Sequence, residues 1–320
     1  MWNFGARIPT PAQLFMRNLS PDSKHYLTLF AGSAAYFAWF GGLVGLRTEH
    51  VFLYFLLVGA YYVHPSARRV VVAFAPFVVY WIMYDSMRIF PNYEINPVHV
   101  AEPYYIEKQW FGVNTPEGRL TWNEFFKERH IPALDIVTGF FYLSWVPIPL
   151  IFALWLLYNN KPLFLKFSYC FLYVNIIGII IYYLYPAAPP WYVEQYGFDL
   201  IYDTPGNSAG LSEFDRLLDV KIFAGMYSKN ASVFAAIPSL HAAFPVMCLL
   251  YGWRLRKKWL NLFFAILVAG IWFSAVYSRH HYIIDVLLGG AVAVFSYFTF
   301  EYLSEKTFLK QRLEELERQI

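Results

Sequence analysis

Charged residues are scarce in this chain of 320 residues. Asp, Glu, Lys and Arg together make up 15% of the sequence, whereas about 25% is usual for a soluble domain. Too few polar side chains remain to cover a water-facing surface, which excludes an ordinary soluble domain. The formal net charge is only +3. The chain therefore has no concentrated basic surface for nucleic acid, and we expect no nucleic-acid partner.

Cysteine is equally rare, with Cys170 and Cys248 as the 2 examples. Both lie in apolar runs, where a free thiol usually packs as a small hydrophobic side chain. These two cysteines therefore predict no disulfide framework, and they do not indicate a redox compartment. The first 25 residues contain basic residues but no apolar stretch followed by a small-residue cleavage site. We therefore expect no removable signal peptide.

Apolar and aromatic residues are abundant instead. The hydrophobic share is 58% and the aromatic share is 21%. A helix that spans a bilayer needs about 20 mostly apolar residues. Candidate stretches are 26–46, 51–66, 70–88, 135–157, 163–185, 236–253, 259–278 and 282–303. The fold class predicted is an all-α, polytopic transmembrane bundle of about eight helices. Because the second stretch is short and ends at Pro65, an interfacial or re-entrant segment there, and a total of six or seven spans, is the alternative.

The distribution of Lys and Arg predicts the orientation of the helices. Cytoplasmic loops are enriched in these residues. The basic residues assigned to one side are Arg7, Arg17, Lys24, Arg68, Arg69, Lys161, Lys166, Arg254, Arg256, Lys257 and Lys258. Two long segments, 89–134 and 186–235, fall on the opposite side. We therefore expect cytoplasmic termini and two long segments on the non-cytoplasmic side, periplasmic or lumenal.

Three regions follow from this topology. Residues 1–134 would hold the N-terminal membrane helices and the first non-cytoplasmic segment. Residues 135–303 would form the catalytic transmembrane core, including the loop 186–235. Residues 304–320 read as a polar, charged cytoplasmic tail.

Two histidines stand where predicted helices reach the same face of the membrane. His241 lies in Pro238-Ser239-Leu240-His241, at the outer end of the sixth helix, and His281 lies at the outer end of the eighth. Asp285 follows His281 by four residues, so on a helix its carboxylate can orient the imidazole and stabilise its charged form. One nucleophile and one general acid–base suffice for a two-step covalent group transfer. Arg279 adds a planar cation suited to phosphate oxygens.

These motifs resemble those of a known family. Pro-Ser-Leu-His followed by His-x-x-x-Asp is similar to the second and third motifs of the type 2 phosphatidic acid phosphatase superfamily. The run Pro186-Ala187-Ala188-Pro189-Pro190-Trp191-Tyr192 resembles its inositol phosphorylceramide synthase branch. The resemblance is strong over about residues 185–290, weak before 90, and implies a six-helix core. The three motifs in this order are specific, whereas His-x-x-x-Asp alone would not be.

The chain also departs from the superfamily pattern. The first phosphatase motif has no match, and Ala275 stands where the phosphatases have an arginine before the third-motif histidine. The phosphate must therefore be held differently. Arg279 is the first candidate for this role and Arg88, at the outer end of the third helix, is the second.

The resemblance implies a two-step reaction. His281 would attack the phosphorus of phosphatidylinositol while Asp285 orients it, and His241 would protonate the departing diacylglycerol oxygen. His241 would then deprotonate the primary hydroxyl of a ceramide, which takes the phosphoinositol group. This scheme requires no metal and no cofactor, because arginine and helix amino ends can bear the phosphate charge.

Further residues are candidates for contact with the substrates. His280 could bind substrate or face the headgroups, and Trp191 and Tyr192 could line the lipid site or only anchor a rigid loop. Ser239 could either cap the sixth helix or contact phosphate. The full set of predicted substrate-binding residues is Arg279, His280, Arg88, Trp191, Tyr192 and Ser239.

Two other functions remain open at this point. A lipid phosphate phosphatase would use the same histidines and aspartate with water as acceptor. A transporter would also explain intramembrane ionisable residues, but these lie here at helix ends and not near the bilayer midplane. The donor headgroup, the ceramide species and any protein partner cannot be read from the sequence.

Overall fold

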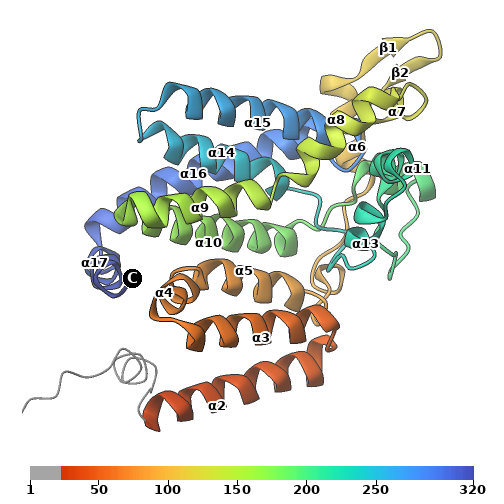
Figure 1. Cartoon of the computed structure of the whole chain (residues 1–320). Helices are drawn as coiled ribbons and strands as arrows, with labels where there is room; N and C mark the ends of the chain where they lie inside the picture. Colours follow the sequence, from red (N-terminus) through yellow and green to blue (C-terminus); the bar gives the residue numbers. More distant parts are fainter. Residues whose placement is uncertain (1–22) are drawn as a thin grey trace, which may run out of the picture. The chain divides into compact units, whose positions relative to one another are not determined.

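Helices dominate the structure, a computed structural model that describes residues 23–320 (Figure 1). The chain divides into two compact units, Met1–Ala75 with Arg318–Ile320 and Pro76–Glu317. The all-α fold class predicted from the sequence is confirmed. The expectation of no signal peptide concerns residues outside the described part of the chain. The predicted regional division at residue 134 stays a prediction.

The described part of the first unit is helical, with apolar helices followed by a shorter helix that carries Arg68 and Arg69. It contains α2 (Ser23–Trp39), the π-helical turn η1 (Phe40–Val44), α3 (Thr48–Val63) and α4 (Pro65–Ala73). Helices α2 and α3 are joined by aromatic rings, with Tyr36 stacked on Tyr54 at a centroid distance of 5.6 Å. The hydroxyls of Ser33 and Tyr54 are 2.6 Å apart. These pairs hold the two helices together inside the first unit.

The second unit is built on long apolar helices that run side by side (Figure 1). Helix α14 packs against α15, α16, α10 and α9 and is almost entirely buried. The helices of this bundle are α5 (Ala75–Ser86), α8 (Pro132–Leu143), α9 (Pro147–Asn159), α10 (Lys161–Leu184), α14 (Leu240–Trp253), α15 (Lys258–Tyr277) and α16 (Ile283–Lys306). The last helix, α17 (Leu309–Gln319), is short and charged.

The two long segments between the helices gather at one end of this bundle (Figure 1). His99 and Ala187, one from each segment, are joined by backbone hydrogen bonds: His99 N donates to Pro186 O and Ala188 N donates to His99 O. The segments contain η2 (Asn92–Glu94), α6 (Ala101–Phe111), the antiparallel hairpin β1 (Val113–Thr115) and β2 (Gly118–Leu120), α7 (Trp122–Lys127), α11 (Pro190–Tyr196), η3 (Ala209–Leu211), α12 (Ser212–Leu218) and α13 (Ile222–Tyr227). Together these elements form a folded layer at this end of the bundle, the cap.

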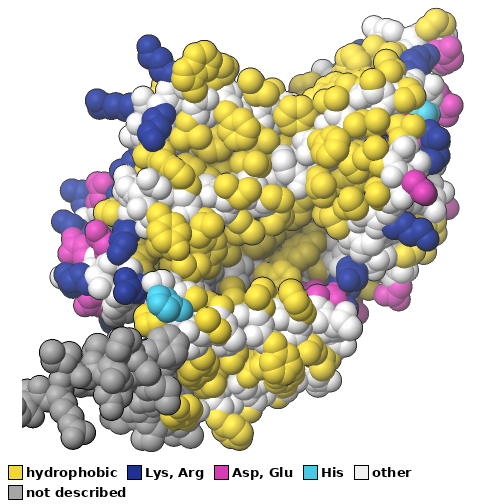
Figure 2. All heavy atoms as spheres, in the orientation of Figure 1, with side chains coloured by type: hydrophobic (Ala, Val, Ile, Leu, Met, Phe, Trp, Pro, Cys, Tyr) yellow, Lys and Arg dark blue, Asp and Glu magenta, His cyan; other side chains and the backbone are white. Residues whose placement is uncertain are grey.

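Large apolar side chains remain exposed along the sides of the bundle helices. Figure 2 shows apolar side chains over the sides of the helical bundle of the second unit, with charged side chains gathered at its two ends. Examples are Phe140, Ile151, Leu154, Ile180, Ile266, Phe273, Phe295 and Phe298. Exposed apolar surface on this scale suits contact with lipid.

Helices lie in each of the eight apolar stretches predicted from the sequence. By length and composition, α10, α15 and α16 can each span a membrane, and the total rises to five if α4 with α5 and α8 with α9 are each one broken span. Shorter apolar helices cover Leu29–Val44, Thr48–Val63 and Leu240–Trp253. The breaks were not expected. They fall just before Pro76 and at Pro147. Proline has no backbone N–H to continue the preceding helix, and its fixed φ suits the first turn of the next helix.

Candidate active site

The starts of α14 and α16 meet at the cap end of the bundle. Ser239 N donates to Asp285 O at 3.0 Å, which links the residue before α14 to the first turn of α16. Gly289, one turn further along α16, faces Ser239, and any larger side chain there would overlap the Ser239 carbonyl. This close approach places the two sequence motifs in contact.

His241 and His281 touch at this junction. His241 Nδ1 and His281 Nε2 are 3.1 Å apart, a hydrogen bond in which one ring nitrogen donates to the other. The His241 ring also packs on Trp145, at a centroid distance of 4.4 Å, and on Tyr142 at 5.0 Å. The structure thus brings together two residues that are 40 positions apart in the chain.

Asp285 lies on the other side of His281. Its Oδ2 is 3.5 Å from His281 Nδ1 and accepts a hydrogen bond from Tyr282 N at 2.8 Å. Asp285 is fully buried and His281 is 5% exposed. Because Nδ1 faces the carboxylate, Nε2 is the nitrogen of His281 that is available for reaction.

Burial sets the charge state of His281. Loss of solvation lowers the pKa of this imidazole to about 4, so the ring is neutral at pH 7. A neutral ring keeps a lone pair on one nitrogen, as a nucleophile requires. The carboxylate of Asp285 is then placed to stabilise the positive charge that the ring acquires on bond formation.

Backbone contacts from the cap hold the turn that carries His281. Asn123 Nδ2 donates to Val276 O and to His281 O, both at 2.9 Å. Gly210 N donates to Ser278 O at 3.0 Å, and Trp191 N donates to Arg279 O at 3.1 Å. Arg279 itself has a left-handed backbone, with φ of 65°. Both long segments of the cap therefore fix this turn.

The two candidate arginines are paired with carboxylates. Arg279 Nη1 is 3.1 Å from Glu194 Oε2, and both side chains are largely buried. Arg88 Nε is 3.2 Å from Asp85 Oδ1, and its Nη2 donates to Lys229 O. Burial raises the pKa of Glu194, and the charge of Arg279 opposes this shift. For either arginine, binding of a phosphate would require competition with these partners, and both roles stay predictions.

The His280 side chain contacts the cap, and its ring also lies 5.5 Å from Tyr142, the residue that packs on His241. His280 is 4% exposed. Its Nε2 contacts Ser208 O at 3.0 Å, and its ring stacks on Tyr227 at a centroid distance of 4.2 Å. Burial lowers the pKa of His280 well below its usual value. These contacts favour a structural role, in which His280 ties the reactive turn to the cap.

Trp191 and Tyr192 are also buried in the cap. Their exposed fractions are 5% and 0%, in a cluster with Val100, Ala188, Ala209 and Phe234. The Tyr192 hydroxyl donates to Asp199 O and accepts from Ile201 N. Rings held in this way favour the alternative of a rigid loop over direct contact with lipid.

Ser239 caps α14. Its Oγ accepts a hydrogen bond from Ala242 N at 3.3 Å, and the side chain is fully buried. Of the two roles predicted for Ser239, this contact corresponds to the helix cap. A phosphate contact by the same residue stays a prediction.

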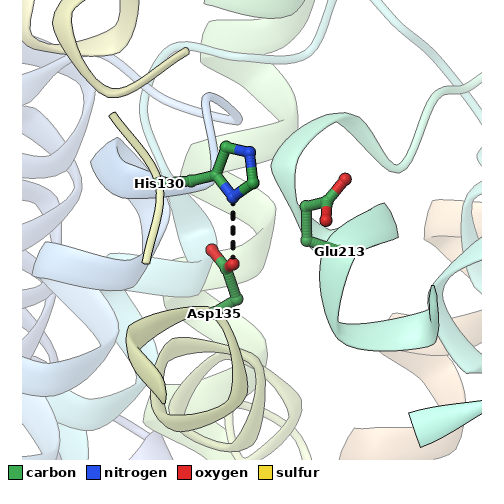
Figure 3. A group of neighbouring side chains, drawn as sticks. All are labelled: His130, Asp135 and Glu213. Carbon is green, nitrogen blue, oxygen red and sulfur yellow. Dashed lines mark hydrogen bonds and ion pairs between the residues drawn. The ribbon is translucent and has the colours of Figure 1, made fainter. Parts of the chain in front are cut away.

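His130, Asp135 and Glu213 form a separate group whose candidate ligand atoms lie within 4.8 Å of one another (Figure 3). Asp135 Oδ1 accepts from the Tyr277 hydroxyl at 2.7 Å, and Asp135 Oδ2 is 3.2 Å from His130 Nδ1. Glu213 is paired with Arg216 at 2.7 Å. Asp135 thus links α8 to Tyr277 of α15, and Glu213 of α12 lies beside it with its own partner, Arg216.

Asn123 and Glu107 contact this site, but no pattern in the sequence indicates them. Asn123 donates hydrogen bonds to the turn that carries His281, from a position more than 150 residues earlier in the chain. Glu107 accepts hydrogen bonds from Ile283 N and Ile284 N, at the start of α16. Neither residue has a motif partner at a characteristic spacing, so no local pattern could have identified it.

Known proteins resemble this chain over most of its length. The model of the PAP2 superfamily matches residues 119–299, which include both histidines and Asp285. The phosphoinositol dihydroceramide synthase of Bacteroides thetaiotaomicron is 44% identical over 284 residues, 88% of this chain and 93% of that protein.

Fungal proteins are more distant relatives. The inositol phosphorylceramide synthase catalytic subunit AUR1 of Saccharomyces cerevisiae is 29% identical over 259 residues, 78% of this chain and 60% of that protein. The inositol phosphorylceramide synthase of Candida albicans is 31% identical over 195 residues, 55% of this chain and 40% of that protein. No solved structure matches the chain.

Proposed function

Since the chain belongs to the PAP2 superfamily, we propose that it is a membrane phosphotransferase that moves phosphoinositol from phosphatidylinositol to the primary hydroxyl of a ceramide. It is an integral membrane protein. The observation that carries the proposal is the contact of His241 Nδ1 with His281 Nε2 at 3.1 Å, beside Asp285. The names of the bacterial and fungal relatives support the choice of substrates.

In the first half-reaction, His281 is the nucleophile. Its Nε2 forms a bond to the phosphorus of the donor while the bond from phosphorus to the diacylglycerol oxygen breaks. His241, in its protonated form, gives a proton to that oxygen. The phosphorylated ring of His281 carries positive charge, which the nearby carboxylate of Asp285 stabilises.

In the second half-reaction, the neutral His241 acts as a base. It takes the proton of the ceramide hydroxyl, whose oxygen attacks the phosphorus as the bond to His281 breaks. His241 thus recovers the proton that it gave away, and no net proton is consumed. One pair of histidines therefore serves both halves of the reaction.

Substrate must separate the two rings. At 3.1 Å they leave no space between His241 Nδ1 and His281 Nε2 for a phosphoryl group. Trp145 and Tyr142 pack on the His241 ring and would have to move with it or make room. We place the site on the non-cytoplasmic face, which the distribution of Lys and Arg in the sequence supports.

Product analysis tests the proposed function. Purified protein in detergent micelles receives phosphatidylinositol and labelled ceramide, and the lipids are identified by mass spectrometry. We expect inositol phosphorylceramide with ceramide present, and only slow release of inositol phosphate with donor alone. Fast hydrolysis of the donor that ceramide does not change would identify a phosphatase and contradict the proposal. The variant His281→Ala is the control for a contaminating activity.

A further inference from the structure

Glu107 is a buried carboxylate beside the reactive residues that the two-step mechanism does not use. It lies on α6, in the cap, and is 0% exposed. Its Oε1 accepts a hydrogen bond from Ile283 N at 3.0 Å, and its Oε2 accepts one from Ile284 N at 3.1 Å. Both carboxylate oxygens are therefore bound to the first turn of α16.

The first turn of a helix has backbone N–H groups without partners inside the helix. At the start of α16, Tyr282 N donates to Asp285 Oδ2. The next two backbone N–H groups, of Ile283 and Ile284, donate to the carboxylate of Glu107. The carboxylate of Glu107, from another part of the fold, thus supplies acceptors for the N-terminal backbone N–H groups of α16. It also lies at the helix end where the dipole favours negative charge.

This arrangement has an electrostatic cost. Burial raises the pKa of Glu107 to about 7, the two amide hydrogen bonds oppose that shift, and the negative charge of Asp285 adds to it. Two carboxyl groups are thus held close together away from water. A helix cap alone needs no such pair, because a neutral side chain can also cap a helix.

We propose that Glu107 is a positioning residue for the pair of His281 and Asp285. It fixes the first turn of α16, and this turn sets the place of the Asp285 carboxylate relative to His281 Nδ1. That distance is 3.5 Å in this structure, longer than a hydrogen bond. A small rotation of the first turn therefore decides whether the carboxylate can orient the ring.

The side chain chemistry of glutamate suits this task. Glutamine at this position would keep one acceptor oxygen, but its NH₂ group cannot accept from the second amide. One of the two amides of Ile283 and Ile284 would then be buried without a partner, and the first turn would shift to find one. Aspartate would keep the charge but is shorter by one methylene group.

The inference rests on the proposed function, and the test is built on Glu107→Gln. The matched control is Glu102→Gln, which changes an exposed glutamate on the same helix. Loss of a residue that orients a reactive group commonly lowers activity about 10- to 100-fold. We expect Glu107→Gln to lower kcat for phosphoinositol transfer by that factor, with KM changed less than about twofold, and Glu102→Gln to resemble the parent.

A second readout reports on His281 without activity. In protein labelled with ¹⁵N-histidine, we expect the ring nitrogen signals of His281, assigned with His281→Ala, to move in Glu107→Gln and to stay in Glu102→Gln. If the parent makes no transfer product but these signals move, the proposed function is wrong and the positioning role stands. A parent-like kcat, or a lower kcat without any change in the His281 signals, would overturn the inference. If Glu107→Gln does not fold, Glu107→Asp is measured in its place under the same criteria.

Discussion

In the proposed mechanism, the covalent chemistry belongs to the neutral ring of His281, which lies between the imidazole of His241 and the carboxylate of Asp285. We expect His281→Ala to lower transfer about 10⁴-fold or more, because the nucleophile is removed. Asp285→Asn should keep the fold and lose most of the rate, since an amide cannot stabilise the charged ring in the same way. Initial rates of product formation in micelles measure both effects.

The control for these variants is His64→Ala, which changes an exposed histidine far along the chain from both motifs. It should transfer at nearly the parent rate. Normal product formation by His281→Ala would remove this residue from the mechanism, and a fully active Asp285→Asn would make Asp285 a packing residue.

Glu107 gives the stability of the protein a dependence on pH. Its pKa is raised from 4.5 to about 7, so it stabilises the folded state fully below about pH 4.5, and this contribution is lost as pH rises through about 7. The change is about 3 kcal/mol, from 1.36 kcal/mol per pKa unit. His281 acts in the opposite sense, because its lowered pKa adds stability above about pH 6.5 that is lost as pH falls through about 4.

A comparison of variants separates the two groups. In Glu107→Gln, the pH dependence of the free energy of unfolding comes only from His281 and the rest of the chain. We expect the Tm of this variant in micelles to fall less between about pH 5 and pH 8 than the Tm of the parent. Parallel curves for the two proteins would show that Glu107 does not titrate in this range.

The proximity of His241, His281 and Asp285 could be predicted from the sequence, but the partners of this group could not. His281 and Asp285 are four positions apart, so helical geometry alone places them side by side, and the Pro-Ser-Leu-His motif adds His241. Glu194 pairs with Arg279 across 85 positions, and Glu107 reaches Ile283 across 176. Such pairs depend on how the cap folds, which no local pattern contains.

At the scale of elements, the contact of α14 with α16 depends on one glycine. A methyl group on Gly289 would overlap the carbonyl of Ser239. We expect Gly289→Ala to separate the two helix starts, to destabilise the protein by about 1–3 kcal/mol, and to lower transfer together with stability. Thermal unfolding and initial rates on the same samples measure both.

Gly225 in α13 offers the matched control, because open space surrounds the position where its Cβ would lie. Gly225→Ala should be neutral or slightly stabilising, as expected for alanine in a helix. If Gly289→Ala were equally well tolerated, the close approach of the helices would not matter for the site.

The helices themselves were more predictable than their interruptions. Apolar length places α10, α15 and α16 within a few residues, because a spanning helix must satisfy its own backbone. The apolar run predicts one helix over 135–157, whereas the structure divides this stretch into α8 and α9 before Pro147. A proline in an apolar run is compatible with either a kink or a break, and tertiary packing decides between them.

At the scale of the whole molecule, the topology can be tested by labelling. Lys221 is an exposed residue of the cap, and Arg256 is an exposed residue at the opposite end of the bundle. In intact cells or sealed vesicles, we expect Lys221→Cys to react with an impermeant maleimide from the non-cytoplasmic side and Arg256→Cys to be protected. The native Cys170 and Cys248 are buried and should give little background.

Detergent provides the control for this experiment, because solubilised protein should be labelled at both positions. Labelling of Arg256→Cys but not of Lys221→Cys from the same side would invert the topology. The proposed site would then face the cytoplasm.

The turn that carries His281 depends on segments far apart in the chain, and this has a consequence for biosynthesis. A ribosome synthesises α6, Asn123 and His241 before α16, which carries Asp285 and begins only at Ile283. A nascent chain that has inserted every helix up to α15 still lacks the end of the nucleophile motif and the anchor points for Glu107. In the proposed mechanism, the growing protein therefore lacks phosphotransfer activity until α16 is in place.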